Sequence, residues 1–123
     1  MDKKKILIVD DEPSIRSLVN SMLGKKYTVI EAGDGEEGLR AAQENRPDII
    51  LMDIMMPRVD GYMACFAMKK DPELKDTPVI ILTGVGFELN RKLSEKFGAN
   101  GYLTKPFQLQ DLQKAIDKFI KAD

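Results

Sequence analysis

The chain alternates short apolar runs with longer stretches in which apolar residues recur every three or four positions. Short runs rich in Ile, Leu and Val are typical of strands buried on both faces. We place five strands, at residues 6–9, 27–30, 48–52, 78–82 and 101–103, and the apolar runs of the first, third and fourth fit strands buried in this way. Between them, recurrence every three or four positions predicts helices with one apolar face. The chain is therefore expected to alternate strands and helices along its whole length.

The first predicted helix begins near Pro13 and ends at Gly24, which are the residue types favoured at those two ends. Further helices are predicted over about residues 36–44, 60–70 and 88–97, the second of them capped by Asp60 and the third closed by Gly98. One face of the last predicted helix carries Leu109, Leu112, Ile116, Phe119 and Ile120.

Five strand–helix units in strict alternation predict a parallel sheet covered by helices on both faces. We predict an α/β fold with a doubly wound five-stranded parallel sheet of flavodoxin-like order 2-1-3-4-5. Five units are too few for an eight-stranded barrel. No repeat, low-complexity tract or linker interrupts the pattern, so we expect residues 1–123 to form one domain with no output domain.

The composition narrows the possible partners and metals. The 19 basic and 20 acidic residues nearly cancel, so no bulk charge attracts nucleic acid or a membrane surface. One cysteine excludes an internal disulfide, and the lack of histidine removes the commonest transition-metal ligand. A metal would be held by oxygen, which favours Mg²⁺ or Ca²⁺. Because we find no signal-peptide core or membrane span, we expect a cytoplasmic protein.

Polar residues lie at or just past the ends of four of the predicted strands. Asp10 and Asp11 follow the first strand, Asp53 the third and Thr83 the fourth, and Lys105 lies just past the fifth. In a doubly wound sheet these positions meet at the carboxyl ends of the strands. Three carboxylates would repel one another without a hard cation such as Mg²⁺, and a lysine suits phosphate oxygens. We therefore expect a site for a phosphoryl group beside a metal, with a carboxylate as nucleophile.

Four segments resemble the receiver domain of two-component response regulators. They are residues 8–12 (IVDDE), 51–57 (LMDIMMP) with Asp60 and Gly61, 81–83 (ILT) and 102–107 (YLTKPF). The resemblance implies a signalling switch rather than a conventional enzyme, one that catalyses its own phosphorylation and slow dephosphorylation. The phosphoryl donor would be a sensor histidine kinase or a His phosphotransfer domain, and the downstream target would be an unknown protein.

The resemblance also implies roles for the residues at the strand ends. Asp53 would be the phosphoacceptor. Asp10, Asp11 and Asp53 would hold Mg²⁺ together with the backbone carbonyl of Met55. Lys105 would contact one phosphoryl oxygen, and Thr83 would donate a hydrogen bond to another.

Switching would then involve a second group of residues. Tyr102 would turn inward behind Thr83, and the readout face would comprise the fourth helix, the fifth strand and the fifth helix, including Asn90 and Arg91. The family's Lys–Pro bond is usually cis, so the bond between Lys105 and Pro106 is expected to be cis. Residues 100–101 are Asn–Gly, and many receivers of the dimeric transcription-factor type have acidic residues there, so we expect a monomer or weak dimer.

Three alternatives stay open. The chain could be a receiver cut from a longer regulator. It could be a Mg²⁺-dependent aspartyl phosphatase of the haloacid-dehalogenase type, although that family needs an aspartate at the position of Met55. A flavodoxin-type electron carrier would need a Ser/Thr/Gly-rich loop after the first strand, where this chain has the acidic run that begins at Asp10.

Overall fold

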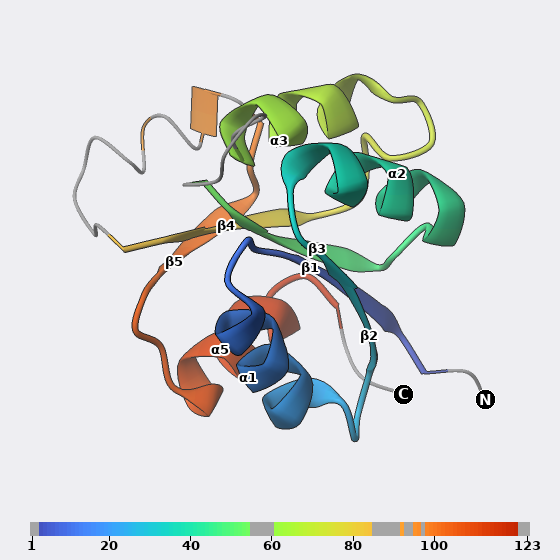
Figure 1. Ribbon diagram of the computed structural model, residues 1–123. Helices are drawn as coiled ribbons and strands as arrows, with labels where there is room; N and C mark the ends of the chain where they lie inside the picture. Colours follow the sequence, from blue (N-terminus) through green and yellow to red (C-terminus); the bar gives the residue numbers. More distant parts are fainter. Residues whose placement is uncertain (1–2, 55–60, 85–91, 93–94, 97, 121–123) are drawn as a thin grey trace.

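Five parallel strands form a single sheet at the centre of the protein (Figure 1). The computed structural model describes residues 3–54, 61–84, 92, 95–96 and 98–120. Along the sheet the strands follow the order β2-β1-β3-β4-β5, which confirms the predicted doubly wound topology. Their bounds are β1 Lys5–Val9, β2 Thr28–Ala32, β3 Ile49–Asp53, β4 Val79–Thr83 and β5 Gly101–Thr104.

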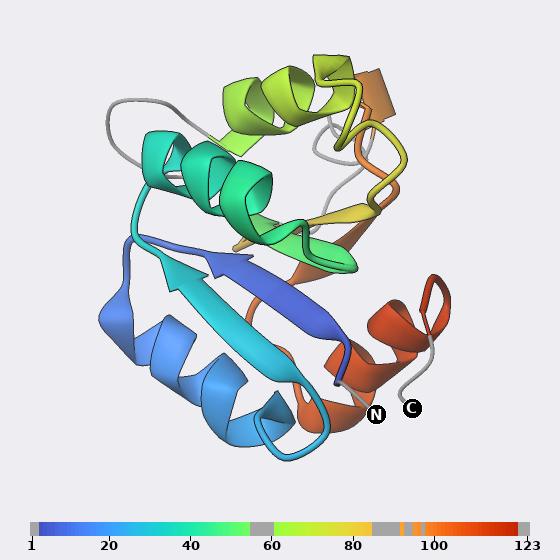
Figure 2. The same cartoon turned by 90° about the vertical axis from the view of Figure 1, so that its right-hand side faces the viewer.

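Helices cover both faces of the sheet, as predicted for a parallel sheet. Helices α2 and α3 lie on one face, and α1 and α5 lie on the other (Figures 1 and 2). Their bounds are α1 Pro13–Leu23, α2 Gly35–Asn45, α3 Gly61–Lys70 and α5 Leu109–Asp117. Most of the helix predicted at residues 88–97 lies outside the described residues, although residues 92, 95 and 96 are helical. Asp60, the predicted cap of the helix at residues 60–70, also lies outside the described residues.

The core is divided into two clusters, one on each face, because successive side chains of a strand point to opposite sides. In β1, Leu7 and Val9 pack toward α2 and α3, whereas Ile6 and Ile8 pack toward α1 and α5. All residues of β3 and β4 are buried. Each fully buried aliphatic side chain contributes roughly 1.5–3 kcal/mol of hydrophobic stabilisation, so the apolar runs that mark the strands also supply much of the core.

The second strand begins one residue later than predicted, and Tyr27 lies before it. The Tyr27 N–H donates to the Leu23 carbonyl at the end of α1 (2.9 Å), which keeps this residue in the turn. Its ring is nevertheless buried, and its hydroxyl accepts a hydrogen bond from Gln113 Nε2 of α5 (2.9 Å). Tyr27 is thus an aromatic residue of the core that directly precedes the strand, and in the sequence it cannot be distinguished from a strand residue.

Gly61, the first residue of α3, lies directly against the end of β3. A Cβ atom at this position would lie 2.6 Å from Ile54 Cα and would also overlap the carbonyl of Asp53. Only glycine lets the helix approach the backbone so closely. This contact positions α3 directly behind the carboxyl end of β3, where the candidate site lies.

Candidate functional site

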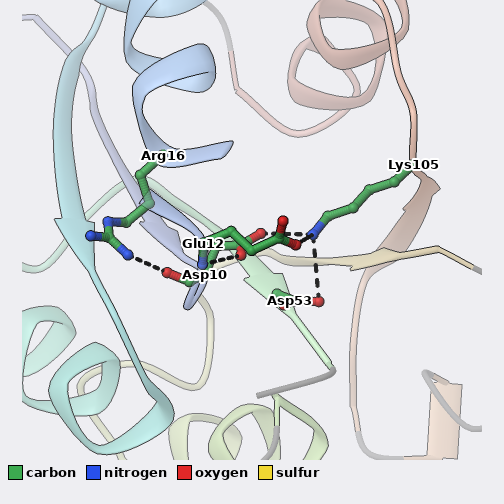
Figure 3. A network of polar contacts seen from close by, with 5 residues as sticks. All are labelled: Asp10, Glu12, Arg16, Asp53 and Lys105. Atoms are coloured by element: carbon green, nitrogen blue, oxygen red, sulfur yellow. Dashed lines mark hydrogen bonds and ion pairs between the residues drawn. The ribbon is translucent and has the colours of Figure 1, made fainter. Parts of the chain in front are cut away.

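The polar residues predicted at the strand ends meet at one edge of the sheet (Figure 3). Asp10 follows β1, Asp53 ends β3, Thr83 ends β4 and Lys105 follows β5. The strand register brings them level, since Asp53 pairs with Leu82 and Thr83 pairs with Thr104. Asp10, Asp53 and Thr83 are all buried polar residues. Burying such groups is costly unless they are hydrogen-bonded or paired.

Lys105 joins the acidic residues of this edge. Its Nζ atom donates a hydrogen bond to Asp10 Oδ2 at 2.8 Å and lies 3.7 Å from Glu12 Oε1 and 3.8 Å from Asp53 Oδ1. The Lys105 side chain is 17% exposed, so its ammonium group is largely shielded from water. One cation therefore neutralises three carboxylates only in part, which leaves the site with net negative charge.

The protonation of Lys105 follows from these contacts. Burial acts to lower the pKa of Lys105, but the hydrogen bond with Asp10 and the negative charges of Asp53, Asp10 and Glu12 outweigh it. The net result is a raised pKa, so the ammonium form persists at neutral pH. A positively charged group is thus permanently held beside the Asp53 carboxylate.

The loop after β1 gathers carboxylate oxygens. Oxygens of Asp10, Asp11 and Glu12 lie within 4.8 Å of one another, with Asp10 buried and the other two exposed. Such oxygen ligands suit a hard divalent cation such as Mg²⁺. Of the predicted metal ligands, Asp10 and Asp11 belong to this group. Asp53 lies next to it, with its Oδ1 atom 3.8 Å from the Lys105 ammonium group. Met55 lies outside the described residues.

Glu12 was not predicted to be part of the site. Its carboxylate lies near Lys105, and its backbone N–H donates to Asp10 Oδ1 at 2.9 Å. The acidic run at residues 10–12 carries a signal for it, but an exposed glutamate beside a proline is also common at a helix start. The contact with Lys105 depends on residues 93 positions away in the chain, and sequence spacing alone does not show it.

The residues expected to act in switching are only partly described. Tyr102 lies on β5 opposite Ile81, is half-buried and packs against the core cluster on the α2–α3 face. The bond between Lys105 and Pro106 is cis, as expected. Asn90 and Arg91, which were expected on the readout face, lie outside the described residues.

Within the described parts of the chain, no helix is both long and apolar enough to cross a lipid bilayer.

Comparison with known proteins agrees with the fold. The family model of the response regulator receiver domain matches residues 6–117. A probable transcriptional regulator, ycf27 of Guillardia theta, is 43% identical over 117 residues, which are 93% of this chain and 44% of the relative. The alkaline phosphatase synthesis transcriptional regulatory protein PhoP of Bacillus subtilis is 36% identical over 96% of this chain and 49% of its own length. The chain thus spans about half the length of the curated relatives it matches.

Solved structures show the same architecture over nearly the whole chain. The chemotaxis protein CheY4 of Vibrio cholerae superimposes with a TM-score of 0.91 at 35% identity, covering 95% of this chain and 98% of CheY4. The receiver domain of a sensor histidine kinase from Pseudomonas aeruginosa superimposes with a TM-score of 0.87 at 32% identity, covering 94% and 96%. That structure has a magnesium ion coordinated in its active-site cleft.

Proposed function

Because this chain belongs to the response regulator receiver domain family, we propose that it is a switch activated by phosphorylation of Asp53. The donor would be the phosphohistidine of a sensor histidine kinase or of a His phosphotransfer domain, and the step would require Mg²⁺. One observation supports this proposal most directly: the buried Asp53 carboxylate lies 3.8 Å from the Lys105 ammonium group, beside an acidic loop that can hold a cation.

The chemistry of the transfer needs no general base. A deprotonated Asp53 oxygen would attack phosphorus while the bond from phosphorus to the histidine nitrogen breaks, and the imidazole leaves. Positioning and charge neutralisation supply most of the catalysis in such transfers. Lys105 would exchange its bond with Asp10 for one with a phosphoryl oxygen, and the Thr83 hydroxyl would donate to another.

The acidic loop fits the metal that this chemistry requires. Asp10, Asp11 and Asp53, with the backbone carbonyl of Met55, would hold Mg²⁺. When bound, Mg²⁺ would offset the charge of the carboxylates and of the phosphoryl oxygens. The magnesium ion in the related Pseudomonas receiver supports this choice of metal.

The signal would pass to the face made by the segment before β5, β5 itself and α5. Phosphorylation adds about −1.5 to −2 charge, which would draw Thr83 and Lys105 toward the new oxygens. Tyr102, now packed against the core cluster, would move into the space behind Thr83. In receivers, the side chains two positions after the phosphoacceptor and two after the threonine influence hydrolysis of the acyl phosphate. Here these residues are Met55 and Val85, and neither has a polar group that could orient a water molecule, so slow dephosphorylation is expected.

The setting of the domain in the cell is a further part of the proposal. We favour a cytoplasmic stand-alone receiver that signals by protein contact as a monomer or weak dimer. The alternative is a receiver that forms part of a longer regulator, which the matched relatives support: they are about twice as long and are named as transcriptional regulators, one of them as DNA-binding. An absence of nucleic-acid binding therefore stays a prediction.

Intact-mass spectrometry after incubation with acetyl phosphate tests the proposed chemistry. The wild-type protein should gain one phosphoryl group with Mg²⁺ and none after chelation. Asp53→Asn should gain none, whereas Asp76→Asn, a change in an exposed aspartate of the segment before β4, should behave as wild type. A wild-type protein that stays unmodified with Mg²⁺ would refute the proposed function.

A further inference from the structure

Arg16 of α1 contacts the acidic loop from the side opposite Lys105 (Figure 3). Its Nη1 atom donates a hydrogen bond to the backbone carbonyl oxygen of Asp10 at 2.6 Å. Its Nε atom donates to Glu31 Oε1 of β2 at 3.2 Å, and the other oxygen of Glu31 accepts from Asn20 Nδ2 at 3.4 Å. The guanidinium group therefore joins α1, the end of β2 and the loop after β1.

This contact completes the set of hydrogen bonds that fixes Asp10. The Asp10 N–H donates to the Ala32 carbonyl at 3.0 Å, Oδ1 accepts from the Glu12 N–H at 2.9 Å, and Oδ2 accepts from Lys105 at 2.8 Å. The carbonyl oxygen accepts from Arg16 Nη1 at 2.6 Å. Because the donor is charged, this bond is stronger than a neutral one.

Arginine is suited to this position because its planar group donates in two directions at once. One edge holds the Asp10 carbonyl while the other is held by Glu31. A lysine has a single nitrogen on a flexible stem and would make both bonds poorly. Glu31 also offsets the guanidinium charge, so the loop can be ordered without a large loss of its negative field.

We propose that Arg16, oriented by Glu31, is a positioning residue that holds the loop of Asp10 and Asp11 in a cation-binding arrangement before the cation arrives. This inference deepens the function proposed above and rests on it. Removing a group that hydrogen-bonds to a metal-binding residue, without touching the metal itself, typically changes metal affinity by 10–100-fold.

The sign of the effect separates positioning from simple electrostatics. Arg16→Met removes a positive charge near the acidic loop, and charge alone would therefore make Mg²⁺ bind more tightly. Loss of positioning would make it bind more weakly. We expect Arg16→Met to raise the Mg²⁺ dissociation constant, measured by calorimetric titration, about tenfold, with Arg16→Lys intermediate.

A second measurement needs no metal. The Glu12 amide bonded to Asp10 Oδ1 should exchange its hydrogen more rapidly in Mg²⁺-free Arg16→Met than in the Mg²⁺-free wild type, as followed by NMR. In the acetyl phosphate reaction, the Mg²⁺ concentration for half-maximal rate should rise, whereas the rate at saturating Mg²⁺ should change much less. Arg46→Met is the matched control, because Arg46 forms a 2.7 Å ion pair with Glu73, distant from this loop.

Unchanged or tighter Mg²⁺ binding in Arg16→Met, or unchanged exchange at Glu12, would overturn the role of Arg16. Equal changes in Arg46→Met would overturn it too, because they would reflect general destabilisation. Failure of the proposed function has a different signature: the wild type itself would take up no phosphoryl group. The exchange measurement on the metal-free protein would still report on Arg16 in that case.

Discussion

Lys105 and Asp10 form an ion pair at 2.8 Å, while Asp53 lies 3.8 Å from the same nitrogen. The lysine is therefore bound to the aspartate of the acidic loop rather than to the expected phosphoacceptor. Because Asp10 is fully buried, this pair both stabilises the fold and places a cation where a phosphoryl group would enter. Activation would then require Lys105 to exchange one negatively charged partner for another.

Removing Lys105 should destabilise the fold. Lys105→Met leaves the buried Asp10 carboxylate without its cation, so we expect the free energy of unfolding at pH 7 to fall by about 1–3 kcal/mol in urea denaturation. The pKa of Lys105 is raised in the folded protein, so the ion pair with Asp10 stabilises the fold fully below the lysine's ordinary pKa of 10.5. This contribution is lost as pH rises through the folded-state pKa of Lys105. The difference between variant and wild type should therefore shrink at strongly alkaline pH; a difference of zero at pH 7 would contradict this.

The exposed carboxylate of Asp11 should matter only when Mg²⁺ is present. Without metal, Asp11→Asn should leave stability unchanged or slightly raised, because one repelling charge is removed from the acidic loop. Mg²⁺ at about five times its dissociation constant should stabilise the wild type by about 1 kcal/mol. Thermal unfolding should show that Asp11→Asn has lost most of this gain. An equal gain in both proteins would exclude Asp11 as a ligand.

Gly61 should tolerate no side chain. In Gly61→Ala the added methyl group would overlap the backbone of Asp53 and Ile54, and we expect a loss of about 1–3 kcal/mol in the free energy of unfolding. Gly84→Ala is the matched control, because a Cβ atom there meets nothing within 4 Å, and its stability should stay within about 0.5 kcal/mol of wild type. Similar effects of the two substitutions in urea denaturation would show that close packing at residue 61 is not the cause.

Cys65 should be inert in the folded protein. Burial raises its pKa from 9.0 to about 11, with the nearby Lys69 charge opposing this in part. At pH 8 a disulfide reagent should modify the thiol rapidly in denaturant and far more slowly in native buffer. Since the folded-state pKa is the higher one, the thiol's contribution to stability is present below pH 9 and is lost as pH rises toward 11. Rapid native labelling would show that α3 opens readily.

Much of the fold could be predicted because the interior strands have a simple pattern of apolar residues. Strands β1, β3 and β4 are buried on both faces, so their sequences are nearly continuous apolar runs, and the polar residue that ends each run marks the carboxyl edge of the sheet. Asp53 and Thr83 were found in this way. Tyr27 was wrongly predicted to lie in the second strand. Its aromatic side chain is needed because it is buried in the core, and its backbone lies in the turn before β2.

The contacts that complete the site could not be predicted from the sequence. Arg16 lies on a helix at a position where an exposed arginine would be ordinary, and its role depends on the Asp10 carbonyl and on Glu31, which other elements position. The pairing of Lys105 with Asp10 spans 95 residues. Such contacts form only when the folded sheet brings distant segments together, and local patterns carry no signal for them.

The central claim, that Asp53 is the nucleophile, is tested most directly by locating the phosphoryl group. After incubation with acetyl phosphate and Mg²⁺, borohydride reduction of the acyl phosphate followed by peptide mapping should reveal one modified residue, Asp53. Modification at Asp10, Asp11 or Glu12 instead, or modification of Asp53→Asn to the wild-type extent, would contradict the proposed chemistry.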